Sequence, residues 1–249
     1  MELGVDLDGA NGLTARNQYV GLAGGFGTFL MGTHDTPLKM SQAKDLFNDG
    51  KFDNANTSGG VLYKAGELRA DNVIAYVSPS FSGVKIVAAT VAGTVAPDVA
   101  PIAPDTLGRE DSEIMDAYSV AVMYGSTKKG LYLAAAYNGG DQFDGAEETR
   151  ISAQYKTGAL TANAMWQDED NTGTNITANA GYKIGKMMPK IKYSTSDLDS
   201  GLNPSTVAIG LNYSLGKKTT AYIEYGTFDT DKAGDSTTTV SSIVLQHKF

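Results

Sequence analysis

Hydrophobic and polar residues alternate with a period of two through most of the chain. In residues 206–215, Val207, Ile209, Leu211 and Tyr213 share one face, and Thr, Ala, Gly, Asn and Ser residues form the other. A period of two is typical of a β-strand with two unlike faces. The pattern predicts about fourteen strands, and residues 37–50 are the one stretch suited to a short helix. The expected strands are 2–8, 17–24, 27–34, 71–79, 83–92, 117–126, 130–139, 149–157, 159–168, 175–184, 188–196, 205–215, 218–228 and 239–249.

The connections between these strands alternate between tight turns and long polar loops. Tight turns such as Thr127–Gly130 carry Gly and Lys, whereas loops such as 93–116 and 140–148 are long and acidic. A strict alternation of short and long connections predicts an antiparallel meander with all its tight turns at one end. A soluble sandwich has no reason to sort loop length and charge in this way.

A meander of many strands must hide its edges, and closure into a barrel achieves this. The expected strands are about ten residues long, which is the length that a tilted membrane strand needs. Their second face is rich in Ser, Thr, Asn, Gln, Gly, Lys and Arg. The sequence therefore predicts an all-β fold, an antiparallel transmembrane β-barrel whose apolar face contacts lipid, in a single domain over residues 1–249.

Composition narrows the functional classes. The 249 residues carry a formal charge of −8, which argues against a nucleic-acid partner. The absence of cysteine excludes disulfides, thiolate metal sites and cysteine nucleophiles. The apolar runs fall far short of the ~20 residues of a membrane-spanning helix. With two histidines and no Gly-x-Ser-x-Gly or His-Glu-x-x-His motif, we expect no enzyme, no metal site and no cofactor.

An ordered set of motifs resembles the general porins of Gram-negative outer membranes. These motifs are Arg16–Leu22, Phe26–Thr28, His34–Pro37, Asp71–Gly83 and the aromatic terminus Phe249. The resemblance implies a water-filled channel in the cell outer membrane for passive diffusion of small hydrophilic solutes and ions. It also implies a homotrimer among outer-membrane lipid and lipopolysaccharide, and a final strand read by the barrel assembly machinery through Phe249.

The start of the chain is expected to differ from that of the family. Family members have sixteen strands and a signal peptide, and the start here has no basic region followed by an apolar one. The motif order matches if the first expected strand is the family's third. We therefore expect about 14 strands of a 16-stranded porin, without the signal peptide and the first two strands.

The resemblance implies that the longest loop, residues 35–70, folds inward as a constriction. Selectivity then depends on the width of the narrowing and on the electric field across it. The candidate acids are Asp45, Asp49 and Asp53. The residues expected beside them are the cations Lys44 and Lys51, and His34, which is either a pH-sensitive pore residue or a hydrogen-bonded anchor of the loop.

Alternation places several cations on the channel wall. The residues expected to point inward are Lys85, Arg150, Lys156, Lys183, Lys190 and Lys192, while Arg16 is either a wall cation or a strand-end anchor. Lysines near tight turns are expected at the mouth of the channel more than at its narrowing. Thr33 occupies a position where the family often has Arg, so an anion preference does not carry over.

Two alternatives remain open at this point. A specific porin would carry a dedicated sugar or anion site, which requires an aromatic slide or a basic ladder along the lumen. A soluble carbohydrate-binding β-protein would instead join its apolar faces in a dry core and would behave as a monomer in plain buffer.

Overall fold

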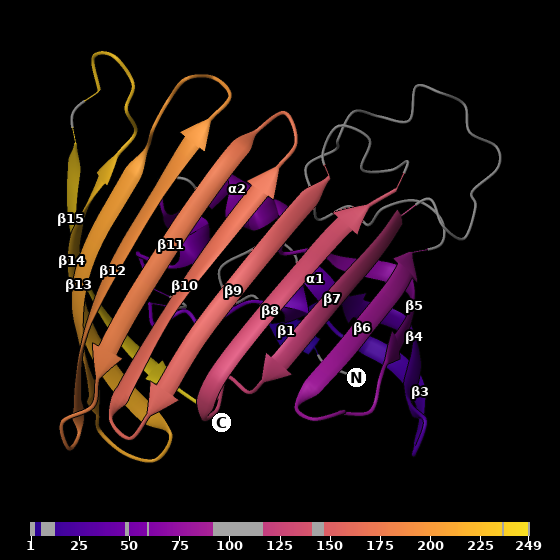
Figure 1. Cartoon of the computed structure of the whole chain (residues 1–249). Coiled ribbons are helices and arrows are strands. Elements are labelled where there is room, and N and C mark those ends of the chain that lie inside the picture. Colours follow the sequence, from indigo (N-terminus) through magenta and orange to yellow (C-terminus); the bar gives the residue numbers. More distant parts are fainter. Residues whose placement is uncertain are drawn as a thin grey trace. The chain divides into compact units, whose positions relative to one another are not determined.

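The computed structural model describes residues 3–5, 13–47, 50–58, 60–91, 117–140, 147–235 and 237–248. In sequence order, β3 to β15 are neighbours in one antiparallel sheet of 13 strands (Figure 1), and β1 pairs with β2 in a second, two-stranded sheet. The strands are β1 (Leu3–Val5), β2 (Leu13–Ala15), β3 (Gln18–Gly24), β4 (Gly27–Asp35), β5 (Arg69–Val77), β6 (Val84–Val91), β7 (Ala117–Gly125), β8 (Gly130–Gly139), β9 (Glu148–Thr157), β10 (Leu160–Glu169), β11 (Gly173–Tyr182), β12 (Met187–Leu198), β13 (Ser205–Ser214), β14 (Thr219–Asp229) and β15 (Thr238–His247).

The meander and its tight turns follow the sequence pattern. Every expected strand from 17–24 onward corresponds to one strand of the large sheet, which confirms the all-β antiparallel fold. Within the expected strand 2–8, residues 3–5 form β1, and the other residues of that range lie outside the described ones. The connection between β9 and β10 contains Gly158 at φ +51°, a left-handed conformation that favours glycine in a two-residue hairpin.

The long connection between β4 and β5 contains short helices. The expected helix within 37–50 is the four-residue α1 (Pro37–Met40), where the Thr36 side chain accepts a hydrogen bond from the Lys39 N–H and Pro37 opens the first turn. The 3₁₀ helix η1 (Asn54–Asn56) and α2 (Gly60–Ala65) were not expected, because segments this short show no helical period. No helix in the described ranges has both the length and the apolar character needed to cross a bilayer.

The chain divides into two compact units, and each is described by itself. The first unit contains residues 1–41, 65–123 and 135–149. Its sheet buries a face of small and apolar side chains. The cluster on this face consists of Leu30, Leu68, Ala70, Val73, Ala75, Ala89, Val91 and Ala117.

The second unit contains residues 42–64, 124–134 and 150–249. Its strands bury polar side chains and expose apolar ones. On β14, Glu224 is 0% exposed and its neighbour Ile223 is 55% exposed; on β12, Lys192 is 0% and Ile191 is 51% exposed. This is the reverse of a soluble protein with a dry apolar core, and it is the pattern of strands whose apolar face contacts lipid.

Candidate functional site

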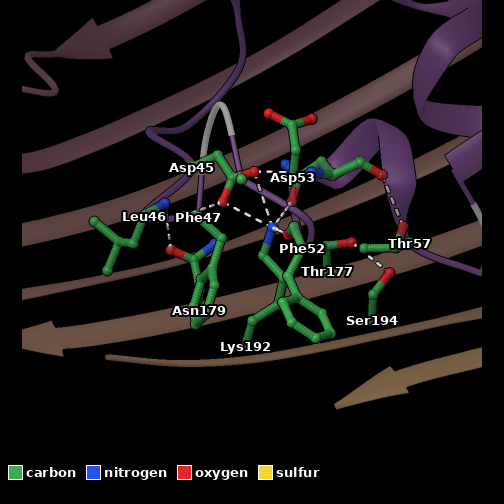
Figure 2. A network of polar contacts seen from close by, with 12 residues as sticks. Asp45, Leu46, Phe47, Phe52, Asp53, Thr57, Thr177, Asn179, Lys192 and Ser194 are labelled. Atoms are coloured by element: carbon green, nitrogen blue, oxygen red, sulfur yellow. Dashed lines mark hydrogen bonds and ion pairs between the residues drawn. The ribbon is translucent and has the colours of Figure 1, made fainter. Parts of the chain in front are cut away.

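Residues 42–47 and 50–58 of the long connection pack against the buried polar face of the second unit. The Lys44 N–H donates to Gln154 Oε1 at 3.0 Å, the Leu46 N–H to Asn179 Oδ1 at 3.3 Å, and the Ser58 N–H to Thr206 Oγ1 at 2.9 Å. A buried loop cannot satisfy its backbone within a ladder, so its N–H groups need side-chain partners. Strands β9, β11 and β13 supply them, and Figure 2 shows Asn179 directed at Leu46.

Lys192 of β12 lies at the centre of this contact. Its ammonium reaches both carboxylate oxygens of Asp45 at 2.8 Å. It also donates to the Phe52 carbonyl oxygen at 2.7 Å (Figure 2) and to Asn54 Oδ1 at 2.5 Å. The Asp45 carboxylate accepts two further hydrogen bonds, from the N–H groups of Phe47 and Asn54. A buried charge is tolerated only when it is paired and hydrogen-bonded in this way.

Lys190, two residues earlier on the same face, makes a second buried ion pair. Its ammonium lies 2.8 Å from Glu224 Oε1, donates to the Leu46 carbonyl oxygen at 2.9 Å, and sits 4.1 Å from the centre of the Phe47 ring. The side chains of Lys190 and Glu224 are 1% and 0% exposed. The two lysines thus hold the loop through its side chains and its carbonyl oxygens.

Aromatic packing completes this part of the contact. Phe47 and Phe52 are fully buried, and the Phe52 ring is stacked on Phe228 with a centroid distance of 4.9 Å. A Cβ atom at Gly226 would collide with the Val207 carbonyl oxygen of β13 and would lie 2.8 Å from the Phe52 ring. The glycine on β14 therefore leaves room both for the neighbouring strand and for the loop.

Arg150 of β9 joins the other end of this loop segment to the same face. Its Nε donates to Gln167 Oε1 at 2.9 Å, and Gln167 Nε2 in turn donates to the Leu62 carbonyl oxygen of α2. The guanidinium also lies 5.3 Å from the centre of the Tyr63 ring, whose hydroxyl donates to Gln42 Oε1 at 2.6 Å. The segment from residue 42 to residue 63 is thus bound to the sheet near both of its ends.

The acids expected on the loop have different surroundings. Asp45 is buried in its ion pair with Lys192, rather than presented to solvent. Asp53 is half-buried, and its Oδ1 accepts the Ala55 N–H at the start of η1. Asp49 lies outside the described residues. Lys44 and Lys51 are exposed. The pore role of these residues stays a prediction.

Of the remaining expected residues, Lys156 is half-buried and Lys183 is exposed in the second unit, and the others belong to the first unit. His34 Nδ1–H donates to the Asp35 carbonyl oxygen at 2.8 Å, and its ring meets Tyr19 edge-on at 4.9 Å. Asp35 forms ion pairs with Lys39 at 3.3 Å and Arg69 at 3.0 Å, so this strand end is firmly connected to both ends of the long connection. Arg16 and Lys85 are exposed.

Sequence reasoning underrated Lys190 and Lys192. Alternation points both side chains inward, but the expectation for inward lysines near tight turns was the channel mouth, and the sequence did not single out these two as contacts of the loop. One available signal was that both lysines lie within a strand and not in a turn. In the register of β12, β13 and β14, Lys190 is paired with Gly210 and Gly210 with Glu224, so Lys190 and Glu224 share a face. The amide anchors Gln154, Gln167 and Asn179 carry no signal that separates them from other polar wall residues.

Comparisons with known proteins agree with this arrangement. The Gram-negative porin family matches residues 1–233. The major outer membrane protein P.IB of Neisseria gonorrhoeae is 27% identical over 291 residues, covering 100% of this chain and 78% of that protein. Its counterpart in Neisseria meningitidis serogroup B is 25% identical over 258 residues, covering 94% and 72%.

Solved structures share the fold. The anion-selective porin from Comamonas acidovorans superposes with a TM-score of 0.64 at 20% identity, covering 96% of this chain and 80% of that one. OmpT of Vibrio cholerae, in its trimer form, gives a TM-score of 0.57 at 17% identity, covering 94% and 79%. Together with the exposed apolar face and the loop bound to the polar face, the family match identifies the chain: it belongs to the Gram-negative porin family and is a β-barrel channel protein of the outer membrane that allows diffusion.

Proposed function

We propose that residues 42–64 are the constriction of a water-filled channel through which small hydrophilic solutes and ions diffuse passively, without catalysis. The observation that carries this proposal is the binding of the segment to the polar face of β9–β14 by two buried lysines. The polar face of a porin lines its channel. A loop fixed on that face occupies part of the cross-section and so limits the size of solutes.

The anchors and the charges that act on passing ions are different residues. Lys192 and Lys190 are neutralised by Asp45 and Glu224 at 2.8 Å, so the two pairs contribute little net charge. Lys44 and Lys51 are exposed and Asp53 is half-buried. In this proposal the anchored backbone sets the width, and these three side chains, together with Asp49, set the local field.

We propose that the protein assembles as a trimer of single-domain barrels. One porin domain spans residues 1–249, with 35–70 as its constriction loop, and three copies form a homotrimer surrounded by outer-membrane lipid and lipopolysaccharide. The trimer form of the Vibrio cholerae neighbour supports the oligomeric state. The aromatic terminus Phe249 is the feature by which the barrel assembly machinery would recognise the final strand.

A single introduced cysteine tests the constriction. The chain has no cysteine, so Lys51→Cys gives one reactive thiol on the exposed side of the loop. Single-channel conductance in planar bilayers is then recorded before and after a bulky cationic or anionic thiol reagent. We expect a stepwise loss of conductance with either reagent, and opposite shifts of the reversal potential under a salt gradient, because each adduct narrows the channel and changes its charge.

Lys129→Cys is the matched control, because Lys129 is equally exposed but lies on the tight turn between β7 and β8. Its modification should leave conductance nearly unchanged. Equal conductance before and after complete modification of Lys51→Cys would overturn the constriction role of the segment.

A further inference from the structure

A cavity of about 540 Å³ opens beside the start of the anchored segment, within the second unit. Its walls come from residues 42–46, from Thr127 in the turn between β7 and β8, from strands β12 to β15 and the turn between β13 and β14, and from Lys248. The cavity lies on the polar face, because Thr220, Tyr222 and Gln246 line it while their neighbours Ala221, Ile223 and Leu245 point the other way. Its volume is in the range of sites for small organic ligands.

Lysines dominate the charged lining of this cavity. Lys44 comes from the anchored segment, Lys217 and Lys218 from the tight turn between β13 and β14, and Lys248 from the end of the chain. The Lys248 N–H donates to the Lys218 carbonyl oxygen at 2.8 Å, which holds these two residues side by side. The four therefore converge from three separate parts of the sequence in a chain whose net charge is −8.

The carboxylates at the cavity do not neutralise these four lysines. Asp45 lines the cavity but pairs with Lys192, and the fifth lining lysine, Lys190, pairs with Glu224. Within the described part of the chain, none of Lys44, Lys217, Lys218 and Lys248 forms an ion pair with a carboxylate. The pKa of the Lys44 ammonium is lowered by desolvation of the ammonium at the cavity wall and by the nearby charges of Lys156 and Lys248, as expected where cations gather.

We propose that this cavity is a binding site for a small polyvalent oxyanion, such as a phosphate-bearing or polycarboxylate solute, which it collects at the tight-turn end of the channel. The proposal rests on the proposed function, because a solute can reach the polar face only through the channel. Ammonium groups on different elements can contact several oxygens of one anion, and their mutual repulsion is relieved when that anion binds.

The position of the cavity selects a dissolved anion rather than a lipid headgroup. The face that carries Ile223 and Leu245, exposed by 55% and 66%, is the one directed at lipid. The lysines are on the opposite face, together with Thr220 and Gln246. A phosphate carried by a lipid would have to leave the bilayer to reach them.

Inorganic pyrophosphate is the probe for this site. Its binding to the full-length protein, folded in detergent, is measured by titration calorimetry at constant ionic strength. We expect saturable binding to the wild type and affinity that is about fivefold or more weaker in Lys217→Gln/Lys218→Gln, since two close charge contacts are lost. Raising the salt concentration should weaken wild-type binding.

Lys186→Gln/Lys232→Gln is the matched control, because it removes the same charge from two other exposed positions, and neither residue nor its direct sequence neighbours line the cavity. Its affinity should stay within about twofold of the wild type. Equal weakening in both variants would mean a diffuse attraction and would overturn the site, as would the absence of saturable binding to the wild type.

Conductance in KCl, recorded on the same preparations, separates this inference from the proposed function. A conducting channel that modification of Lys51→Cys narrows, but that does not bind pyrophosphate, contradicts only the anion site. Pyrophosphate binding to a protein whose conductance does not respond at Lys51→Cys contradicts only the constriction.

Discussion

Sheets built by the same alternation bury different sets of side chains in the two units. In the first unit, strands β4 to β7 bury a cluster of Ala, Val and Leu, typified by Val73 at 1% and Ala117 at 1% exposed, although Asn138 and Glu148 of the same unit are buried as well. In the second unit the buried face contains Arg150, Lys192 and Glu224, each 0% exposed. The strand pattern alone thus fixes which residues share a face, but not what that face contacts.

The difference follows from what each face holds. In the first unit, Leu38 at the start of the long connection is buried with Ala121 and Ala136, and its N–H donates to Ser119 Oγ at 3.1 Å. The polar face holds irregular backbone, whose N–H and carbonyl groups must be satisfied by side chains. Lys192 alone bonds a carbonyl oxygen, an amide oxygen and a carboxylate of the loop. Specific polar contacts therefore fix the position of residues 42–64 in a way that apolar packing would not.

The largest effect is expected from Lys192→Met. This change leaves the Asp45 carboxylate buried without its partner, which typically costs about 3–5 kcal/mol. We expect a much lower unfolding temperature in detergent and noisier, larger conductance steps as the loop loosens.

Asp45→Asn/Lys192→Met is the control for that variant, because it removes both charges and so avoids an unpaired one. We expect it to recover part of the loss. A single variant as stable as the wild type would contradict the anchoring role of the pair.

Two single substitutions, each exchanging a methyl for a hydroxyl group or the reverse, compare how the two buried faces tolerate a change of polarity. Val73→Thr puts a hydroxyl into the apolar cluster of the first unit, and Thr177→Val removes one that bonds Asn175 and Ser194 in the second. Both changes conserve volume, and each should cost about 1–3 kcal/mol for opposite reasons. Thermal unfolding in detergent measures the loss of stability in both variants. If Thr177→Val were as stable as the wild type, the polar face would tolerate an apolar residue as readily as the buried face of the first unit does.

The smallest effect concerns the pH dependence of anion binding. Because the pKa of Lys44 lies below its ordinary value of 10.5, its positive charge is lost at lower pH than that of an ordinary lysine. Sulfate keeps its charge in this range, so its affinity should start to fall as the pH rises through the lowered pKa, by about twofold for one exposed charge. In Lys44→Gln, the affinity for sulfate should no longer fall in this pH range. If the affinity of the variant depended on pH as that of the wild type does, Lys44 would not be the cause of the fall.

The sequence predicted the sheet well because each strand carries its own alternation, and strands such as β13 and β14 lie close to their expected ranges. It also identified Arg150, Lys190 and Lys192 as facing away from lipid. It could not identify their loop partners, because the bonds of Lys192 to Asp45 and Phe52 join residues about 140 positions apart and depend on how an irregular segment folds. The apolar buried face of the first unit was likewise not anticipated, since alternating Ala and Val fit either side of a membrane strand.

The most direct test of the account is a disulfide between the loop and the polar face, made by Ser58→Cys/Thr206→Cys. The two hydroxyl oxygens lie 3.0 Å apart, and the chain has no other cysteine. If residues 42–64 occupy the polar face in the conducting channel, the disulfide should form readily, and single-channel conductance should be the same before and after its reduction. Failure of the disulfide to form in the folded protein, or a clear rise in conductance on reduction, would contradict the position that we assign to the loop.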